Sequence, residues 1–261
     1  MRDAGRELGR RTDGVRARTG ALHSAAMTDD HQNPPELFGT MSTMRAMRRL
    51  KPDPVPDELL EQLVQAAVWA PSGSNLQQFH YVVVTDRAVM SRLEPLWRRC
   101  VDAYLGSAGK ATPPNMDEGA YRRMVAAIEY QRDHFAETPA LIVPCYRYVQ
   151  PKGDMEGLRA MREALGTGAL LRLMRSGVFS TVAETSSVYP GVQNLLLAAR
   201  GLGLGATITV WHLMLEREWK QVLGIPKQVN TFAVIPVGWP VGNFGPVRRR
   251  PVPEVMHRDG W

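Results

Sequence analysis

Apolar residues recur at helical spacing in two clear stretches of the chain. One amphipathic helix is predicted to begin at Pro56 or Asp57, because a proline suits the first turn and the spacing i, i+3, i+4, i+7 follows in Leu60, Leu63, Val64 and Ala67. A second begins near Tyr189 and ends at Gly201 and Gly203, and its stripe is Val192, Leu195, Leu196 and Ala199. Weaker patterns predict helices over about 37–49, 86–100, 121–135 and 216–223.

Strands are predicted where β-branched and aromatic residues run together, over 79–85, 140–146, 205–210 and 231–238. The prolines at 52, 54 and 56 end the first helix, and residues 71–75 break the second. Residues 105–118 are predicted to form a mobile loop, and 150–180 a loop with a short helix. Short strands separated by about 40–50 residues do not suit tight βαβ units, so the pattern predicts a layered α+β domain.

Composition narrows the class of protein. A chain of 261 residues that is 44% hydrophobic can bury a full core, and it has no apolar run long enough to span a membrane. Two distant cysteines fit a reduced cytosol, so we expect a cytoplasmic protein. The six histidines are scattered and form no cluster with cysteine, so no metal site is expected.

The net charge of +6 is concentrated in part at the N-terminus, where residues 1–26 hold six arginines against three acids. Residues 1–33 are therefore predicted to be a disordered basic extension, and 34–261 the folded domain. One interpretation of the extension is a translation start placed upstream of Met27. The other is a nucleic-acid-binding tail, but no aromatic-basic interleaving or binding motif supports it, and we expect no nucleic-acid partner.

Three short segments could carry chemistry. Arg45, Arg48 and Arg49 are predicted to lie on adjacent faces of a helix end, and a guanidinium matches a phosphate bidentately. The turn at 71–77 exposes backbone N–H groups, a hydroxyl and an amide, and residues 248–250 are a second arginine run. Each alone is more typical of a solvated face or an ordinary polar loop. No catalytic triad or carboxylate pair is legible, which indicates chemistry carried by a cofactor.

In combination these segments resemble the nitroreductase family. Four motifs occur in the family's order between about Thr40 and Val255, namely Arg45-x-x-Arg48 with 51–56, Ala70–Gln77, Gln193–Gly203, and Pro236-x-Gly238 with a terminal Arg-Arg-Pro. The resemblance implies an α+β layered fold with a central, mixed but mainly antiparallel sheet flanked by helices. It also implies an intertwined homodimer that binds flavin mononucleotide (FMN) at two sites across its interface.

The resemblance assigns the cofactor contacts position by position. Arg45, Arg48 and Arg249 are expected to hold the phosphate and the pyrimidine edge, with Arg248 as an adjacent candidate. Ala46 stands where the family usually has serine, so one hydroxyl contact is expected to be lost. The remaining expected contacts are a turn that reaches the flavin from the partner chain and a strand end whose backbone N–H reaches flavin N5, which match Ser72, Gly73, Asn75, Ile208 and Thr209.

The activity that the resemblance implies is ping-pong transfer of hydride from NADH or NADPH, through flavin N5, to a small-molecule acceptor such as a nitroarene or quinone. Arg48 is the residue expected to stabilise the anionic reduced flavin. Two alternatives stay open: a family offshoot that performs reductive dehalogenation or flavin destruction, and a flavin-binding protein without turnover. The residues that would decide lie in 100–135 and 150–185, where a lid is expected.

Overall fold

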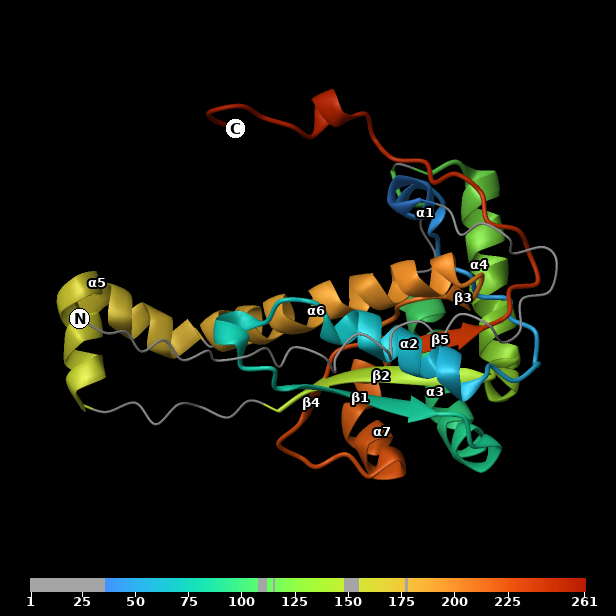
Figure 1. The fold of residues 1–261 in the computed structure, drawn as a ribbon, viewed down its shortest axis with the longest axis horizontal. Coiled ribbons are helices and arrows are strands. Elements are labelled where there is room, and N and C mark those ends of the chain that lie inside the picture. Colours follow the sequence, from blue (N-terminus) through green and yellow to red (C-terminus); the bar gives the residue numbers. More distant parts are fainter. Residues whose placement is uncertain (1–35, 108–111, 115, 148–154, 177) are drawn as a thin grey trace, which may run out of the picture. The chain divides into compact units, whose positions relative to one another are not determined.

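The computed structural model describes residues 36–107, 112–114, 116–147, 155–176 and 178–261 (Figure 1). The predicted basic extension and the boundary at 33/34 lie outside these residues and stay predictions. The α-helices are α1 (Leu37–Thr43), α2 (Asp57–Val68), α3 (Arg87–Ser107), α4 (Glu118–Asp133), α5 (Met155–Ser176), α6 (Val178–Gly201) and α7 (Glu216–Leu223). Short 3₁₀ helices are η1 (Gly73–Asn75), η3 (Phe135–Glu137), η4 (Trp211–Leu215) and η5 (Val252–Glu254).

Within the described residues the sheet has five strands, which are β1 (Phe79–Val84), β2 (Ala140–Tyr146), β3 (Gly205–Ala206), β4 (Asn230–Thr231) and β5 (Ile235–Gly238). Its order is β1-β2-β5-β3, and β4 pairs with β2 beside β5. The pairings between these strands are antiparallel; Val84 faces Leu141 at one end of β1 and Ile235 faces Ile142 in β5. The predicted α+β class and mainly antiparallel sheet are confirmed.

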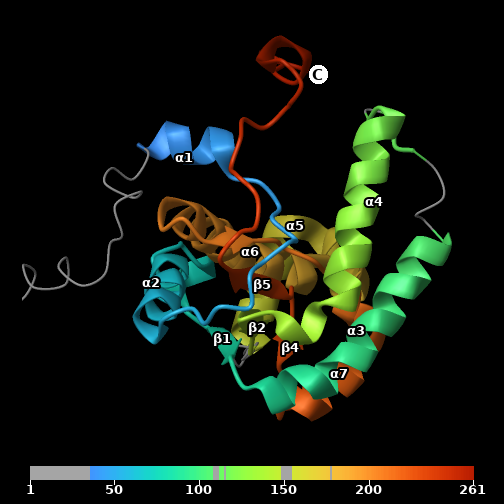
Figure 2. The ribbon, with the colours of Figure 1, turned by 90° about the vertical axis from the view of Figure 1, so that its right-hand side faces the viewer.

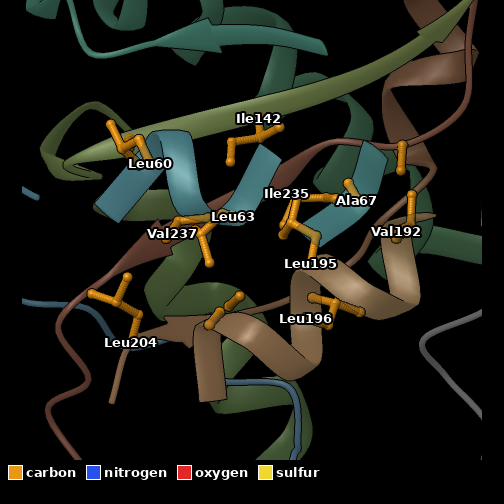
Figure 3. Packing of buried hydrophobic residues seen from close by; sticks show 14 of the residues in the cluster. Leu60, Leu63, Ala67, Ile142, Val192, Leu195, Leu196, Leu204, Ile235 and Val237 are labelled. Atoms are coloured by element: carbon orange, nitrogen blue, oxygen red, sulfur yellow. The ribbon is translucent and has the colours of Figure 1, made fainter. Parts of the chain in front are cut away.

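Strand β2 is buried on both faces because helices cover the sheet on both sides (Figures 1 and 2). Ala140 and Ile142 pack into a core with α2 and α6, and Figure 3 shows Ile142 beside Leu63, Ala67 and Leu195. The alternate residues Leu141 and Val143 pack into a second core with α3, α4 and α7. The period of two in a strand thus divides one sequence run between two hydrophobic layers.

Helices α2 and α6 approach each other closely at Gly191. A Cβ atom at that position would lie 2.8 Å from the carbonyl oxygen of Ala67 and 2.6 Å from the hydroxyl of Tyr81. Since real Cβ atoms do not approach so closely, glycine is required there. The contact joins the two predicted amphipathic stripes into one core.

Several predicted boundaries are wrong. The first helix ends at Thr43, and α3 continues to Ser107 through the start of the predicted loop. Helix α6 begins at Val178 and holds Pro190 in its interior, because burial of Val188 and Val192 on either side outweighs the lost backbone hydrogen bond. The 150–180 stretch contains the 22-residue helix α5, although residues 150–154 lie outside the described part.

Two further properties concern the described residues only. None of their helices is both long and apolar enough to cross a membrane. Within the same residues, no group of three or more His, Cys, Asp and Glu side chains is placed to hold a metal ion.

Candidate flavin site

The basic segment, residues 44–50, is extended, so the prediction that it continues the first helix is wrong. Helix α1 ends at Thr43, and Met44 already has the extended angles φ −68° and ψ 120°. The N–H of Met47 donates to the carbonyl of Ala206 at the end of β3, over 3.0 Å. These sheet-like hydrogen bonds replace those that a continued helix would make. The arginines are therefore placed by the sheet edge and not by helical periodicity.

The chain that follows β5 lies along the other side of the basic segment. Leu50 forms a β-bridge with Pro240, and the N–H of Val241 donates to the carbonyl of Arg49 over 3.0 Å. Further along, the N–H of Val247 donates to the carbonyl of Ser42 over 2.9 Å. The structure thus places Val247, which precedes the C-terminal arginine run, beside Ser42, which lies three residues before Arg45.

Arg48 is the partly buried cation of this segment. Burial lowers the pKa of its guanidinium, and the nearby Tyr104 acts in the opposite direction. Among the described residues its side chain has no hydrogen-bond acceptor and no carboxylate partner. A desolvated charge without a counter-charge is unfavourable, so an anion bound here would be strongly stabilised.

The other predicted arginines differ in their surroundings. Arg45 is exposed, with its Nη1 3.8 Å from where a Cβ on Gly245 would lie, and its neighbour Ala46 is exposed too. Arg248 and Arg249 are exposed, and Nη1 of Arg249 donates to the carbonyl of Arg248 over 2.8 Å. The backbone therefore brings the two arginine groups near one another, while the Arg249 side chain is turned back on its own chain.

Arg200, at the C-terminal end of α6, is a cation of this region that the sequence reasoning missed. Its Nε donates to Oγ1 of Thr43 over 3.0 Å, and its guanidinium carbon lies 4.2 Å from the centre of the Phe244 ring. Arg200 therefore joins α6 to the end of α1, which precedes the basic segment, and to the C-terminal segment that leads to Arg248. The available signal was a cation in the last turn of an otherwise apolar helix, where the helix dipole favours it.

The candidate turn, Ser72–Asn75, is docked on the middle of α6. The N–H of Gly73 donates to Oγ of Ser187 over 3.0 Å, and Oγ of Ser72 accepts from the N–H of Gln77 over 3.1 Å. Asn75 has a φ of 52°, a left-handed conformation that non-glycine residues rarely adopt. The side chain of Asn75 is exposed, so it is accessible to a ligand or a partner.

The predicted strand end is at the edge of the sheet, after β3. The N–H of Thr209 donates to the carbonyl of Val234 over 3.1 Å, and the N–H of Thr207 to that of Pro236 over 3.4 Å. Because successive residues of an extended chain alternate sides, the N–H of Ile208 between them is directed away from β5. Ile208, which is 38% exposed, is therefore the residue with a backbone donor available to a ligand, whereas that of Thr209 is already used.

The chain does not bring the turn and the arginines together. The turn is bound to Ser187 and the basic segment is bound near Arg200, thirteen residues further along α6. At 1.5 Å of rise per residue, these attachment points are roughly 20 Å apart. Within one chain the turn and the basic segment are therefore attached to α6 at separate points.

A comparison with protein-family models matches residues 42–239 to the model described as the nitroreductase family. The chain belongs to the nitroreductase family. The match includes the basic segment, the candidate turn and the strand end, while Arg248 and Arg249 lie beyond it. The chain is also similar over most of its length to the NADH dehydrogenase of Thermus thermophilus. The two are 28% identical over 214 residues, which are 81% of this chain and 90% of that protein.

Solved structures of nitroreductase folds resemble the chain at low identity. Iodotyrosine deiodinase bound to FMN and 3-iodo-L-tyrosine has a TM-score of 0.59 at 18% identity, covering 86% of this chain and 98% of that one. A BluB-like flavoprotein from Clostridium difficile 630 also has a TM-score of 0.59, at 20% identity, covering 85% of this chain and 98% of that one. These likenesses establish the nitroreductase fold.

Proposed function

We propose that this nitroreductase-family oxidoreductase binds FMN and transfers hydride from NADH or NADPH to a small-molecule acceptor. The observation that carries the proposal is the partly buried guanidinium of Arg48, which has no anionic partner among the described residues. Two flavoproteins among the solved structures of this fold and a relative that is an NADH dehydrogenase support it.

The residues present fit FMN. Arg48 supplies a positive charge with no carboxylate partner among the described residues. Arg45, three residues earlier, is exposed, and Arg249 follows Val247, whose N–H binds Ser42. Ile208 supplies a backbone donor at the sheet edge, as described above. FMN, when bound, supplies two-electron chemistry, taking hydride from the nicotinamide and giving it to the acceptor. Arg48 would stabilise the negative charge of the reduced state, because a fixed cation in a partly desolvated site costs no reorganisation.

The proposal includes a homodimer in which the partner's turn completes each site. Exposed apolar side chains flank the turn: Trp69 is 75% exposed and Leu76 is 44% exposed. Helix α1 adds Phe38, which is 78% exposed. Large apolar side chains so exposed are typical of a protein-protein interface. Dimerisation would bring Ser72, Gly73 and Asn75 of one chain to the arginines of the other.

The first experiment measures FMN binding. Purified protein should be yellow or take up FMN, and NADH or NADPH should bleach it. Arg48→Met should weaken FMN binding by roughly 10- to 100-fold, because hydrogen bonds to charged groups contribute about 1.5–3 kcal/mol. Arg217→Met removes an exposed arginine of α7 and is the control. A colourless wild-type protein that takes up no FMN would refute the proposal.

The second experiment identifies the mechanism and the acceptor. Initial rates at several concentrations of nicotinamide and acceptor should give parallel reciprocal lines, as ping-pong transfer requires; intersecting lines would contradict it. A screen with each nicotinamide should include nitroarenes, quinones and enones.

Reductive dehalogenation is the second candidate, because iodotyrosine deiodinase of Danio rerio is 34% identical over 60 residues. That match covers 23% of this chain and 20% of the deiodinase, so it supports a test and not an assignment. Adding a halophenol to the acceptor screen decides between the two activities. Halide release faster than nitro or quinone reduction would favour dehalogenation.

A further inference from the structure

A small cavity lies between the basic segment and helix α4. Its volume is ≈ 10 Å³, about that needed by one water molecule. The residues around it come from the basic segment, from the end of α4 and from the chain that leads into β2, and they are Arg48, Leu50, Tyr130, Gln131, His134 and Thr138.

The side chain of Gln131 is the unusual member of this set. Gln131 is only 4% exposed, and its Nε2 is buried with no hydrogen-bond partner among the described residues. Buried amide donors are almost always satisfied in folded proteins. A buried glutamine donor beside a cavity of one water's size therefore indicates that an acceptor belongs in that cavity.

The chemistry of the cavity wall decides what the occupant is. Nε2 of Gln131 and the guanidinium of Arg48 are both donors, so they cannot bind each other and need a group with two acceptor positions between them. Nδ1 of His134 lies 2.9 Å from the carbonyl of Tyr130 and must donate to it. His134 is thus oriented by a backbone carbonyl at the cavity wall. A water molecule, with two acceptor positions, matches the two donors.

The α4 side of the cavity is held in place independently. The rings of Tyr130 and His134 stack with centres 3.9 Å apart, and the guanidinium carbon of Arg49 lies 5.2 Å from the centre of the Tyr130 ring. A water bound to Gln131 is thus attached to a fixed wall and can in turn orient Arg48.

We propose that one water molecule occupies this cavity and links Nε2 of Gln131 to Arg48, which makes Gln131 a positioning residue for that arginine. The water itself depends only on the cavity. Its consequence for the flavin rests on the function proposed above, in which Arg48 stabilises the reduced cofactor. The two parts are therefore tested separately.

The first test needs no flavin. A crystal structure should show one water within hydrogen-bond distance of both Gln131 and Arg48. Gln131→Leu should lower the melting temperature by about 2–6 °C, because the bridging water loses a donor. The control is Gln62→Leu at an exposed position of α2. An unchanged or raised melting temperature, an empty cavity, a halide ion, or direct contact between Gln131 and Arg48 would overturn the proposal.

The second test uses the FMN-loaded protein. Gln131→Glu places a carboxylate beside Arg48 and competes for its charge, so the preference for reduced over oxidised FMN should fall about tenfold, or about 30 mV in midpoint potential. Gln62→Glu is the charge-matched control and should keep the wild-type potential. A wild-type potential in Gln131→Glu would refute the positioning role. Failure of wild-type protein to bind FMN would refute the proposed function alone, since the first test would still stand.

Discussion

We expect His212 in η4 to lower the free energy of unfolding as the pH falls from neutral into the mildly acidic range. The residue is fully buried, and burial lowers its pKa from 6.5 to about 4, with Glu216 raising it and Lys220 lowering it further. Its Nε2 lies 3.0 Å from Oγ1 of Thr231, whose hydroxyl donates to Glu216 over 2.9 Å. Nε2 must therefore carry the ring proton. Nδ1 is buried without a partner among the described residues, so a second proton would be unsatisfied there.

The sign and size of the effect follow from the two pKa values. Above pH 6.5 the ring is neutral in the folded and unfolded chains, and stability does not depend on it. Below pH 6.5 His212 is protonated in the unfolded chain but stays neutral in the folded chain. The free energy of unfolding therefore falls with pH until the pH nears 4. Between pH 7 and pH 5 the loss is about 2 kcal/mol. In a chain of this size it corresponds to a melting temperature roughly 4–8 °C lower.

The assay is thermal and urea unfolding at pH 7 and pH 5, at constant ionic strength. His212→Gln should be less stable than wild type at pH 7, because it disturbs a packed core. The difference in the free energy of unfolding between pH 7 and pH 5 should nevertheless be smaller than in wild type by about 2 kcal/mol, since glutamine does not titrate. His80→Gln removes an exposed histidine from β1 and should keep the wild-type difference. The full wild-type difference in His212→Gln would refute the reasoning.

Two further substitutions test how α6 holds the fold and the candidate turn. Gly191→Ala should destabilise the protein by about 1–3 kcal/mol in urea unfolding, because its Cβ would lie 2.6 Å from the Tyr81 hydroxyl. Gly201→Ala is the matched control, because a Cβ there would have nothing within 4 Å. Equal stability of the two variants would contradict the close approach. Ser187→Ala removes the acceptor of the turn's backbone N–H and should cost about 1–3 kcal/mol and weaken FMN binding, whereas the exposed neighbour Ser186→Ala should do neither.

The sequence pattern alone was sufficient to predict those helices and strands whose apolar residues are the ones buried in the fold. The apolar stripes of α2 and α6 lie where the helical spacing puts them, because each buries one face in the same core. Strands β1 and β2 lie where β-branched and aromatic residues run together, and β2 contributes to both cores. The motif order was also sufficient to predict the family. The assignment of individual cofactor contacts stays a prediction, since motifs name residues without placing their side chains.

Tertiary structure decided what depends on partners distant in sequence. Residues 44–50 have a pattern that favours a helix, yet hydrogen bonds to Ala206 and Val241 make them extended. Only the sheet register shows that Ile208, and not Thr209, has a backbone N–H without a partner among the described residues, since a shift of one residue reverses the alternation. The isolation of Arg48 from every described carboxylate is likewise a property of the folded chain. The sequence by itself determined the family and predicted which residues would contact the proposed flavin. The packing of the segments around β3 and β5 decided which of those residues are exposed and which have partners.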